Sequence, residues 1–418
     1  MEKTYLCIDL KSFYASVEAV ERGLDPFKTN LVVADETRGR GAICLAITPA
    51  MKALGIKNRC RVYEIPENVE YITAMPRMKK YMEYSAMIYG IYLKYISKDD
   101  IYVYSIDECF FDVTSYLWMY GTTPVEMAQM LMDAVYKETG ICATAGVGTN
   151  MFLAKVALDI TAKHAPDNIG YLDEEEFKKS VWRHRPITDI WNIGRGIANR
   201  LAKYGIYDLW GVTQINEETL YREFGVNAEF LIDHAHGREP CTIEEIKSFK
   251  PESASISNSQ ILFRDYTWEE ALTVVKEMVD LQVLELVEKN LVTNSMSLSV
   301  AYSKNSAKAT GGTAKLSDYT NSARKIMPEF IDYYERTVRK DKPIRKITVG
   351  FNHLVVMEYR TIDMFADVEA DEKEKKKQEA IIAIKKKFGK NAILKGTSLE
   401  KNATAMERNK LIGGHRGE

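Results

Sequence analysis

The chain has 418 residues, of which 46% are hydrophobic and 28% are charged, and its formal net charge at pH 7 is −2. This length favours two to four domains, and the composition is that of a soluble globular protein. No segment approaches the roughly 18 to 20 apolar residues of a membrane helix, and no signal peptide precedes the first predicted strand. We therefore expect a cytoplasmic protein without membrane contact.

The cysteines argue against a zinc site or a disulfide framework. No two of the six form a Cys-x-x-Cys pair, and each lies among apolar or mixed neighbours. Such spacing is typical of reduced thiols in a cytosolic protein. The six residues are Cys7, Cys44, Cys60, Cys109, Cys142 and Cys241.

The first 165 residues predict a mixed α+β domain. The run 4–8 is short, apolar and partly β-branched, which indicates a buried strand that ends at Asp9. Further strands are predicted at 31–34, 42–47, 101–105, 109–113 and 143–147, and helices at 12–22, 49–54, 79–96, 124–139 and 151–163. Residues 28–73 form a small predicted subdomain within the larger one.

The composition changes after residue 165. Residues 166–245 predict short helices around a Gly-rich turn, and Pro251 with the Ser/Asn run 253–259 predicts a linker. The following order of strand, helix, strand, strand, helix and strand, up to residue 354, predicts a βαββαβ unit. Residues 371–418 hold 13 Lys/Arg and 7 Asp/Glu, so we expect a basic and mostly solvated tail with one amphipathic stretch.

Three carboxylates end or interrupt predicted buried strands. Asp9 ends the first strand, and Asp107 and Glu108 lie in a turn between two apolar runs. An Asp-Glu pair in a turn is often only solvated, but the apolar flanks place this pair between buried strands. Clustered carboxylates repel one another unless cations lie between them. The pattern therefore predicts two Mg²⁺ ions about 3.5 to 4 Å apart, with oxygen ligands.

The motifs around these carboxylates resemble those of the Y-family DNA polymerases, the class that copies damaged templates. Residues 9–18 (Asp-Leu-Lys-Ser-Phe-Tyr-Ala-Ser-Val-Glu) are similar to the first motif of that family. Residues 104–110 contain its Ser-Ile-Asp-Glu box, and residues 145–163 resemble its third motif. The amino-acid sequences of segments 191–194 and 236–240 are similar to those of the UmuC-like bacterial branch. The resemblance covers roughly residues 4 to 365, and the combined spacing is far more specific than any one motif.

The resemblance implies the fold and the domains. The fold would be a multidomain α+β right-hand polymerase with a palm, small fingers, a helical thumb that contains a helix-hairpin-helix, and a βαββαβ little finger. The implied ranges are 1–27 and 74–165 for the palm, 28–73 for the fingers, 166–245 for the thumb, 246–256 for a linker, 257–356 for the little finger and 357–418 for a C-terminal tail.

The resemblance also implies roles for the residues that match its motifs. Asp9, Asp107 and the backbone carbonyl of Leu10 would bind the nucleotide-side Mg²⁺, and Asp9, Asp107 and Glu108 the primer-side Mg²⁺, with Mn²⁺ able to substitute. Tyr14 would be the steric gate, which lies under the sugar and clashes with a 2′-hydroxyl. Its neighbour Phe13 and the distant Lys163 would complete this part of the nucleotide site. On its own, Tyr14 fits core packing as well as the role of gate, Phe13 fits core packing better than Tyr14 does, and Lys163 fits a helix-dipole partner.

The predicted fingers depart from the archaeal and DinB-type pattern. Pro49 and Lys52 stand where those enzymes carry Tyr and Arg. Lys52 supplies a point charge but no bidentate fork, and Pro49 supplies no hydroxyl. We therefore expect nucleotide contacts from Thr48 and Lys52, with Arg38 and Arg40 as further candidates in what is otherwise an ordinary Gly/Arg turn.

Contacts with DNA and a sliding clamp are expected farther along the chain. The segment with Ile193, Gly194 and Gly196 resembles the hairpin of a helix-hairpin-helix, whose backbone N–H groups reach a DNA phosphate. A Gly-rich turn between helices is the alternative. In the βαββαβ unit Lys304 and Lys308 are candidate backbone contacts. Residues 361–365 resemble a clamp-binding pentapeptide, in which Thr361 replaces the usual Gln and the apolar anchors are Ile362, Met364 and Phe365.

These features predict a monomeric, template-directed DNA polymerase. It would bind primer-template DNA and add deoxynucleotides from dNTPs to a primer 3′-hydroxyl, with low fidelity, in translesion synthesis during DNA repair and the SOS response. Two alternatives stay open. One is another palm-type two-metal enzyme, such as a nucleotide cyclase, which needs neither the hairpin nor the βαββαβ unit. The other is a non-catalytic DNA-binding scaffold, for which a broken carboxylate set is expected.

Overall fold

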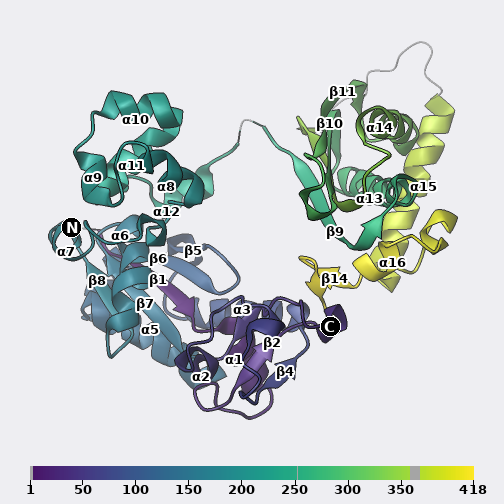
Figure 1. Cartoon of the computed structure of the whole chain (residues 1–418). Coiled ribbons are helices and arrows are strands. Elements are labelled where there is room, and N and C mark those ends of the chain that lie inside the picture. Colours follow the sequence, from purple (N-terminus) through teal and green to yellow (C-terminus); the bar gives the residue numbers. More distant parts are fainter. Residues whose placement is uncertain (1–2, 252, 358–367) are drawn as a thin grey trace. The chain divides into compact units, whose positions relative to one another are not determined.

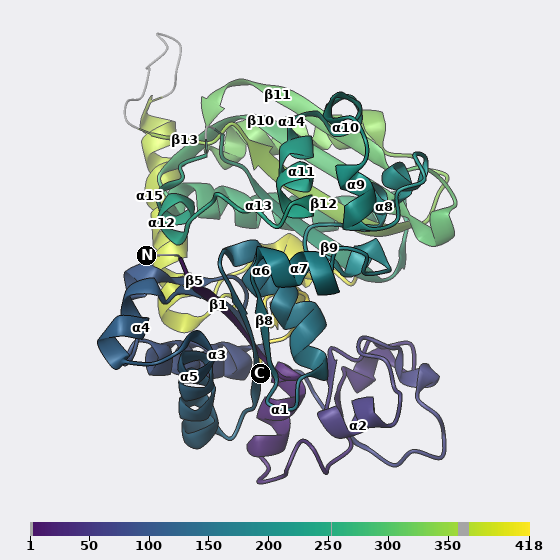
Figure 2. The same cartoon turned by 90° about the vertical axis from the view of Figure 1, so that its left-hand side faces the viewer.

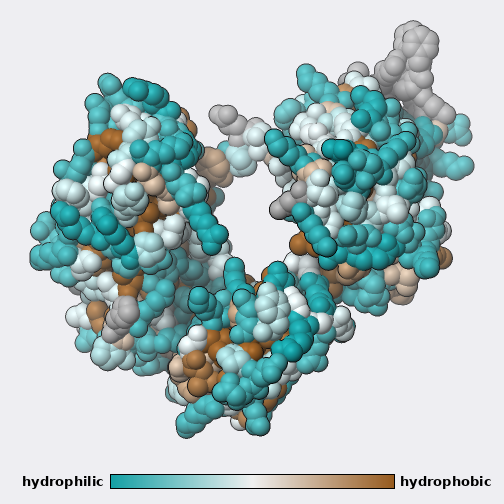
Figure 3. All heavy atoms as spheres, in the orientation of Figure 1, coloured by the Kyte–Doolittle hydropathy of each residue, from teal (hydrophilic) through white to brown (hydrophobic). Residues whose placement is uncertain are grey.

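The computed structural model describes residues 3–251, 253–357 and 368–418 (Figure 1). The chain forms two compact units, of which the first comprises Met1–Phe249 and His415–Glu418 and the second Lys250–Gly414. None of the helices in the described ranges has the length and apolar character needed to span a bilayer. In the view of Figure 3 the surface of both units is mostly hydrophilic, as expected for globular units with apolar interiors.

A five-stranded sheet organises the first unit. Its order is β5-β6-β1-β7-β8, and β1 pairs antiparallel with β6 on one side and with β7 on the other. Because β1 is central and covered on both faces, its apolar side chains are almost completely buried. The strands are β1 (Tyr5–Leu10), β5 (Ile101–Val103), β6 (Glu108–Asp112), β7 (Ala143–Gly148) and β8 (Ile169–Leu172).

Helices cover this sheet. Helix α6 packs against β1, β7 and β8, and α3 lies beside α1 and α5 (Figure 2). Helix α5 begins with a capping box between Thr123 and Glu126 and ends at Gly140, whose φ is 72°, the usual signals for the two ends of a helix. The helices are α1 (Phe13–Val20), α3 (Met78–Tyr92), α4 (Thr114–Tyr120), α5 (Pro124–Thr139) and α6 (Met151–Val156).

A small sheet, β3-β2-β4, forms a separate layer over residues 28–74. It consists of β2 (Leu31–Val33), β3 (Ala46–Ile47) and β4 (Ile72–Ala74), with α2 (Pro49–Ala53) beside it. The strand predicted over 42–47 is therefore mostly wrong, since only its last two residues join the sheet. The cause is a second pairing, in which the Cys44 N–H donates to the Cys60 carbonyl at 2.8 Å and the Val62 N–H donates to the Ala42 carbonyl at 3.0 Å.

Short helices follow from Glu174 on, as the sequence predicts, but Ile169–Leu172 at the start of the predicted range 166–245 instead forms β8 of the five-stranded sheet. Several begin at an Asp, Asn or Thr whose side chain accepts a backbone N–H bond, for example Asp173, Asp208 and Thr242. Their apolar sides share one core with α6 that includes Phe177, Leu201 and Leu231. The helices are α7 (Glu174–Ser180), α8 (Arg195–Ala202), α9 (Leu209–Thr213), α10 (Glu217–Phe224), α11 (Ala228–Ala235) and α12 (Ile243–Ser248).

The second unit has the predicted βαββαβ order. Its antiparallel sheet runs β11-β10-β12-β9, and both helices pack on it around a core that includes Val279, Phe330 and Phe351. Polar side chains occupy other sheet positions, where the hydroxyls of Ser259 and Thr348 lie 2.9 Å apart. The elements are β9 (Ile256–Tyr266), α13 (Trp268–Glu288), β10 (Leu291–Tyr302), β11 (Thr310–Thr320), α14 (Ala323–Thr337), β12 (Ile344–Asn352) and β13 (Val355–Val356).

The basic tail is more ordered than its composition predicts. Helix α15 (Val368–Phe388) packs along α13, and α16 (Ala405–Arg408) is docked by a carboxylate. The buried Glu277 accepts hydrogen bonds from the backbone N–H groups of Thr404 at 2.8 Å and Ala405 at 3.1 Å. These N–H groups begin a helical turn and have no partner inside it. The short strands β14 (Leu411–Ile412) and β15 (His415–Arg416) end the chain.

Candidate active site

Strand register brings the three carboxylates to one place. Asp9 lies directly opposite Glu108 in the antiparallel pair of β1 and β6. Directly opposite residues project to the same face, with Cβ atoms about 4.5 to 5.5 Å apart. The Leu10 N–H donates to the carbonyl of Asp107 at 3.0 Å. All three predicted carboxylates and the Leu10 backbone therefore lie at the same end of adjacent strands.

The electrostatics of Asp9 show that negative charge is crowded here. Burial, and then the charges of Asp107 and Glu108, raise the pKa of Asp9 to about 7. A carboxylic acid loses its proton less readily when it is desolvated and lies beside other negative charges. Divalent cations relieve this repulsion, and carboxylate and carbonyl oxygens are the ligands that Mg²⁺ prefers. The donor set of Asp9, Leu10, Asp107 and Glu108 thus fits a two-cation site.

In the structure as it stands, protein groups engage two of these carboxylates. The Nζ of Lys155 lies 2.8 Å from Glu108 Oε1, and the Cys7 thiol donates to the same oxygen at 3.0 Å. Asp107 Oδ1 accepts from the Ser105 hydroxyl at 2.7 Å. Over the described ranges, accordingly, no three His, Cys, Asp or Glu side chains already surround one ion position. The cationic partner of Glu108 is an ammonium.

Lys155 is a residue of the site to which the sequence analysis gave no role. Burial by itself lowers the pKa of this lysine, but the acidic groups of Cys7, Glu108 and Asp159 raise it above its ordinary value. Lys155 is therefore charged, and its Nζ also lies 3.1 Å from Asp159. A buried ammonium with two carboxylate partners is a strong fixed interaction.

Two glycines explain how Lys155 comes so close to the strands. A Cβ atom at Gly146 on β7 would lie 2.0 Å from the carbonyl oxygen of Ala154, and one at Gly148 would lie 2.3 Å from the Ala154 nitrogen. Only residues without a Cβ let helix α6 approach β7 this closely. The spacing of these glycines in the third motif indicates that a helix packs closely against the strand. It does not indicate that Lys155 is the side chain of that helix that reaches the site.

Lys52 lies near the charge of Asp9 and near two further lysines. Burial lowers the pKa of Lys52, the charge of Asp9 opposes that shift, and the charges of Lys11 and Lys163 add to it. Lys52 therefore lies within electrostatic range of Asp9, Lys11 and Lys163, although these groups come from distant segments. Lys163 is exposed and lies in the 3₁₀ turn Ala162–His164, which follows α6 and the π-helical turn Ala157–Thr161. Lys11 was not among the predicted nucleotide contacts.

The predicted gate and its neighbour occupy different environments. Phe13 is buried, which fits core packing, whereas Tyr14 is half-buried. The ring of Tyr14 stacks on Tyr81 of α3, with 4.4 Å between ring centroids and an interplanar angle of 16°. Thr48 is completely buried, and its hydroxyl donates to the Thr29 carbonyl at 2.8 Å and accepts from the Leu31 N–H. That hydroxyl is already engaged within the small sheet.

The predicted DNA contacts come from later segments of the chain. Gly194 caps α8, and a Cβ atom added at Gly194 or Gly196 would meet nothing within 4 Å, so this turn is open, while Ile193 is buried. In the second unit Lys304 and Lys308 are exposed between β10 and β11. The predicted clamp-binding residues fall outside the described residues, namely Thr361, Ile362, Met364 and Phe365.

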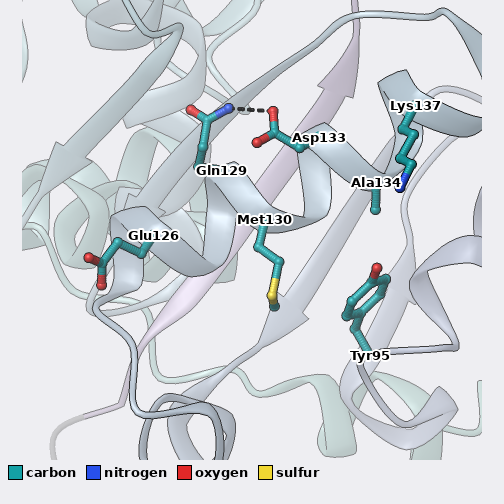
Figure 4. Close-up of a pocket in the computed structure, with 7 residues that line it drawn as sticks. All are labelled: Tyr95, Glu126, Gln129, Met130, Asp133, Ala134 and Lys137. Carbon is teal, nitrogen blue, oxygen red and sulfur yellow. Dashed lines mark hydrogen bonds between the residues drawn. The ribbon is translucent and has the colours of Figure 1, made fainter.

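One small cavity lies at this site, and a larger one lies elsewhere in the first unit. One of about 20 Å³ is lined by Leu10, Asp107 and Glu108, together with Tyr89 and Tyr92 of α3. A larger one, of about 450 Å³, lies against α5, where Figure 4 shows Met130 and Tyr95 facing it. The larger cavity contains none of the predicted site residues, so its size does not mark the active centre.

We expect Mg²⁺ to bind more tightly as the pH rises from 6 to 8. The pKa of Asp9 is about 7, and a carboxylate must be ionised to act as a full ligand. In the metal-free protein the contribution of Asp9 to the stability of the fold changes in the opposite direction, because it decreases as the pH rises. The raised pKa stabilises the fold at pH values below the ordinary value of 3.8, and this contribution is lost as the pH rises through about 7.

Thermal unfolding at pH 6 and pH 8, with and without MgCl₂, checks both signs. The rise in Tm on adding Mg²⁺ is expected to be larger at pH 8. An equal rise at the two pH values would contradict the assignment of Asp9 as a ligand. Asp133→Asn serves as the control, because this exposed carboxylate lies on α5 and bonds only to the neighbouring Gln129 side chain at 2.7 Å.

Comparison with known proteins places the chain in a family. The model of the impB/mucB/samB family matches residues 8–159, and the model of the impB/mucB/samB family C-terminal domain matches residues 253–364. The UV-damage repair protein UvrX of Bacillus subtilis (strain 168) is 31% identical over 423 residues, which cover 99% of this chain and 98% of UvrX. DNA polymerase IV 2 of Halalkalibacterium halodurans is 30% identical over 426 residues, with 99% and 100% coverage.

A solved structure supports the same conclusion at the level of the fold. The Y-family DNA polymerase chimera of Dbh and Dpo4 is 21% identical and covers 84% of this chain and 99% of its own, with a TM-score of 0.65. The predicted multidomain α+β polymerase fold is therefore confirmed. The first matched model spans the segments that contain Asp9 and Asp107-Glu108. The chain belongs to the impB/mucB/samB family, the Y-family of translesion DNA polymerases.

Proposed function

We propose that this chain is a template-directed DNA polymerase that extends a primer 3′-hydroxyl by two-metal catalysis and copies damaged templates. One observation carries the proposal: the register of β1 and β6 sets Asp9 opposite Glu108, with Asp107 joined to Leu10. Asp9, Asp107, Glu108 and the Leu10 carbonyl would hold two Mg²⁺ ions, which would supply positive charge beside the primer 3′-hydroxyl and the triphosphate.

The residues around the carboxylates suit a triphosphate. A dNTP carries about four negative charges, and cationic side chains offset what the metals leave. Lys52 lies within electrostatic range of Asp9, Lys11 and Lys163, so the repulsion that the other two lysines exert on Lys52 is relieved when a polyanion binds beside it. Lys155 instead holds Glu108 in place. Pro49 and the engaged hydroxyl of Thr48 leave the lysines as the main phosphate contacts of this region.

Contacts with the DNA are sequence-independent in this proposal. The open turn at Gly194 and Gly196 presents backbone N–H groups to a phosphate, as the N-terminus of α8 follows directly. Lys304 and Lys308 add positive charge from the second unit. A sliding clamp would bind the segment of Ile362, Met364 and Phe365, and the active form would be a cytoplasmic monomer on primer-template DNA.

Primer extension on undamaged and damaged templates tests the function. We expect extension of a labelled primer with dNTPs and Mg²⁺ on both templates, and none when a chelator removes the metal. The same assay with a single dNTP, analysed for cyclic nucleotide, separates polymerisation from cyclisation. Cyclic product without primer extension would favour a cyclase and overturn the proposal.

We expect Tyr14→Ala to increase the use of ribonucleotides. Removing the ring opens the space in which a 2′-hydroxyl otherwise collides, while the metal-binding carboxylates are untouched. The measurement is the ratio of kcat/KM for a dNTP to that for the matching rNTP, which we expect to fall by more than about tenfold, equivalent to about 1.4 kcal/mol. An unchanged ratio would remove Tyr14 from the role of gate and leave the polymerase proposal to stand on the carboxylates.

A further inference from the structure

The proposed gate rests on a second tyrosine. The rings of Tyr14 and Tyr81 are nearly parallel, with centroids 4.4 Å apart. Tyr14 belongs to α1, and Tyr81 lies in the first turns of α3, more than 60 residues later. Tyr81 is completely buried, whereas Tyr14 is half-buried. The inner ring therefore forms a flat floor beneath the outer one.

A buried carboxylate fixes the position of Tyr81. The Tyr81 hydroxyl donates to Glu18 Oε1 at 2.8 Å, and the guanidinium of Arg77 donates to both Glu18 oxygens at 2.9 Å each. Arg22 also bonds to the Glu18 carboxylate and carbonyl. Burial alone would raise the pKa of Glu18, but the bonds from Arg77, Arg22 and Tyr81 lower it below its ordinary value. This ionised network joins α1 to α3 directly behind the stacked rings.

Such a network resists rearrangement because the loss of any one member costs free energy. The Glu18 side chain is 0% exposed, and removal of one partner would leave a buried charge incompletely paired. The phenol of Tyr81 is therefore held at its tip by Glu18 while its ring lies against that of Tyr14. A steric gate depends on such support, since a ring that swings aside no longer collides with a 2′-hydroxyl.

The same two helices contain a natural comparison one turn away. The Tyr84 hydroxyl donates to Glu21 Oε1 at 2.7 Å, so the pair repeats the link between Tyr81 and Glu18 at positions three residues on. Tyr84, however, is only partly buried and stacks on no aromatic ring in the described parts of the chain. It has the polar link between the helices without the contact to the gate.

We propose that Tyr81, anchored by Glu18 and Arg77, is a positioning residue that holds the Tyr14 ring in place and thereby sets discrimination against ribonucleotides. This inference rests on the proposed role of Tyr14. It adds that selection of the sugar depends on a buried ion network that touches neither the nucleotide nor the metals. An aromatic pair of this kind corresponds to about a two- to tenfold factor in an equilibrium, and the expected loss of discrimination has that size.

The test compares Tyr81→Leu, Tyr81→Phe and Tyr84→Leu in the full chain. Tyr81→Leu removes the flat floor, and we expect the dNTP/rNTP ratio of kcat/KM to fall by about two- to tenfold. Tyr81→Phe retains the ring but loses its bond to Glu18, and its ratio should lie between those of Tyr81→Leu and the wild type. Tyr84→Leu removes a tyrosine from the same helix and should leave the ratio at the wild-type value. Circular dichroism and unfolding temperature show that each variant is folded.

The double variant Tyr14→Ala, Tyr81→Leu separates the inference from the proposal beneath it. If Tyr81 acts through Tyr14, the double variant discriminates no worse than Tyr14→Ala alone. A folded Tyr81→Leu protein with the wild-type ratio overturns the inference, whereas an unchanged ratio in Tyr14→Ala overturns the role of Tyr14 itself. If Tyr81→Leu does not fold, Arg77→Lys takes its place, because it breaks the two-pronged bond to Glu18 without opening a cavity. A wild-type ratio in that variant is equally fatal to the inference.

Discussion

Joint replacement of Asp107 and Glu108 by alanine is expected to abolish primer extension while DNA binding persists. The double variant removes two of the three carboxylates that meet at the ends of β1 and β6. Metal ions held there would supply several kcal/mol of transition-state stabilisation, and about 1.4 kcal/mol is a tenfold change in rate. A loss of at least about a hundredfold should therefore appear in single-nucleotide incorporation under excess enzyme.

The fold should survive this change, because Lys155 retains Asp159 as a partner at 3.1 Å. Binding to a fluorescent primer-template, measured by anisotropy in Mg²⁺-free buffer, should stay close to the wild-type value. Asp133→Ala is the matched control, since it removes an exposed carboxylate from α5 of the same unit. Normal incorporation by the double variant would show that the catalytic metals are held elsewhere.

Gly146→Ala is expected to destabilise the first unit strongly. Its new Cβ would lie 2.0 Å from the Ala154 carbonyl oxygen and 2.3 Å from the Leu158 nitrogen, both of them backbone atoms of the packed helix. A helix cannot shift as a flexible side chain can, and overpacking of this kind costs about 3 kcal/mol or more. In a unit of this size we expect Tm to fall by at least about 6 °C.

Gly90→Ala provides the opposite case in the same unit. Gly90 is exposed within α3, and a Cβ added there would meet nothing within 4 Å. Alanine is the better helix former by about 1 kcal/mol, so Tm should stay constant or rise. Comparable losses of stability in both variants would mean that the close contact of α6 with β7 is not what Gly146 provides.

The sequence predicted the carboxylates better than it predicted their surroundings. Asp9 and the Asp107-Glu108 pair stand out because charged residues end apolar strand-like runs, and such runs are buried. The pairing register of the strands is harder to predict, since a shift of one residue turns every side chain of a strand to the other face of the sheet. Strands almost 100 residues apart carry no local signal for the pairing of Asp9 with Glu108, which only the assembled sheet specifies.

Contacts between distant elements account for most of what was missed. Lys155 reaches Glu108 because of glycines on a neighbouring strand, and Tyr81 reaches Tyr14 across two helices. Neither residue is unusual in its local sequence. The strand predicted at 42–47 fails for the same reason, because Ala42 and Cys44 find hydrogen-bond partners near Cys60 that no periodicity indicates. The charge-rich tail is mostly exposed, as its composition predicts, but nothing in the local sequence indicates that Glu277 docks it at Thr404.

The end of the chain has a practical consequence for anyone who shortens or extends this protein. Although the chain before them belongs to the second unit, residues His415–Glu418 belong to the first. There the Gly417 carbonyl accepts a bond from the Lys79 N–H at 2.9 Å, and Arg416 lies 3.8 Å from Asp35. A purification handle fused behind Glu418 would thus start from a packed surface, and deletion of the tail would strip both units of neighbours at once.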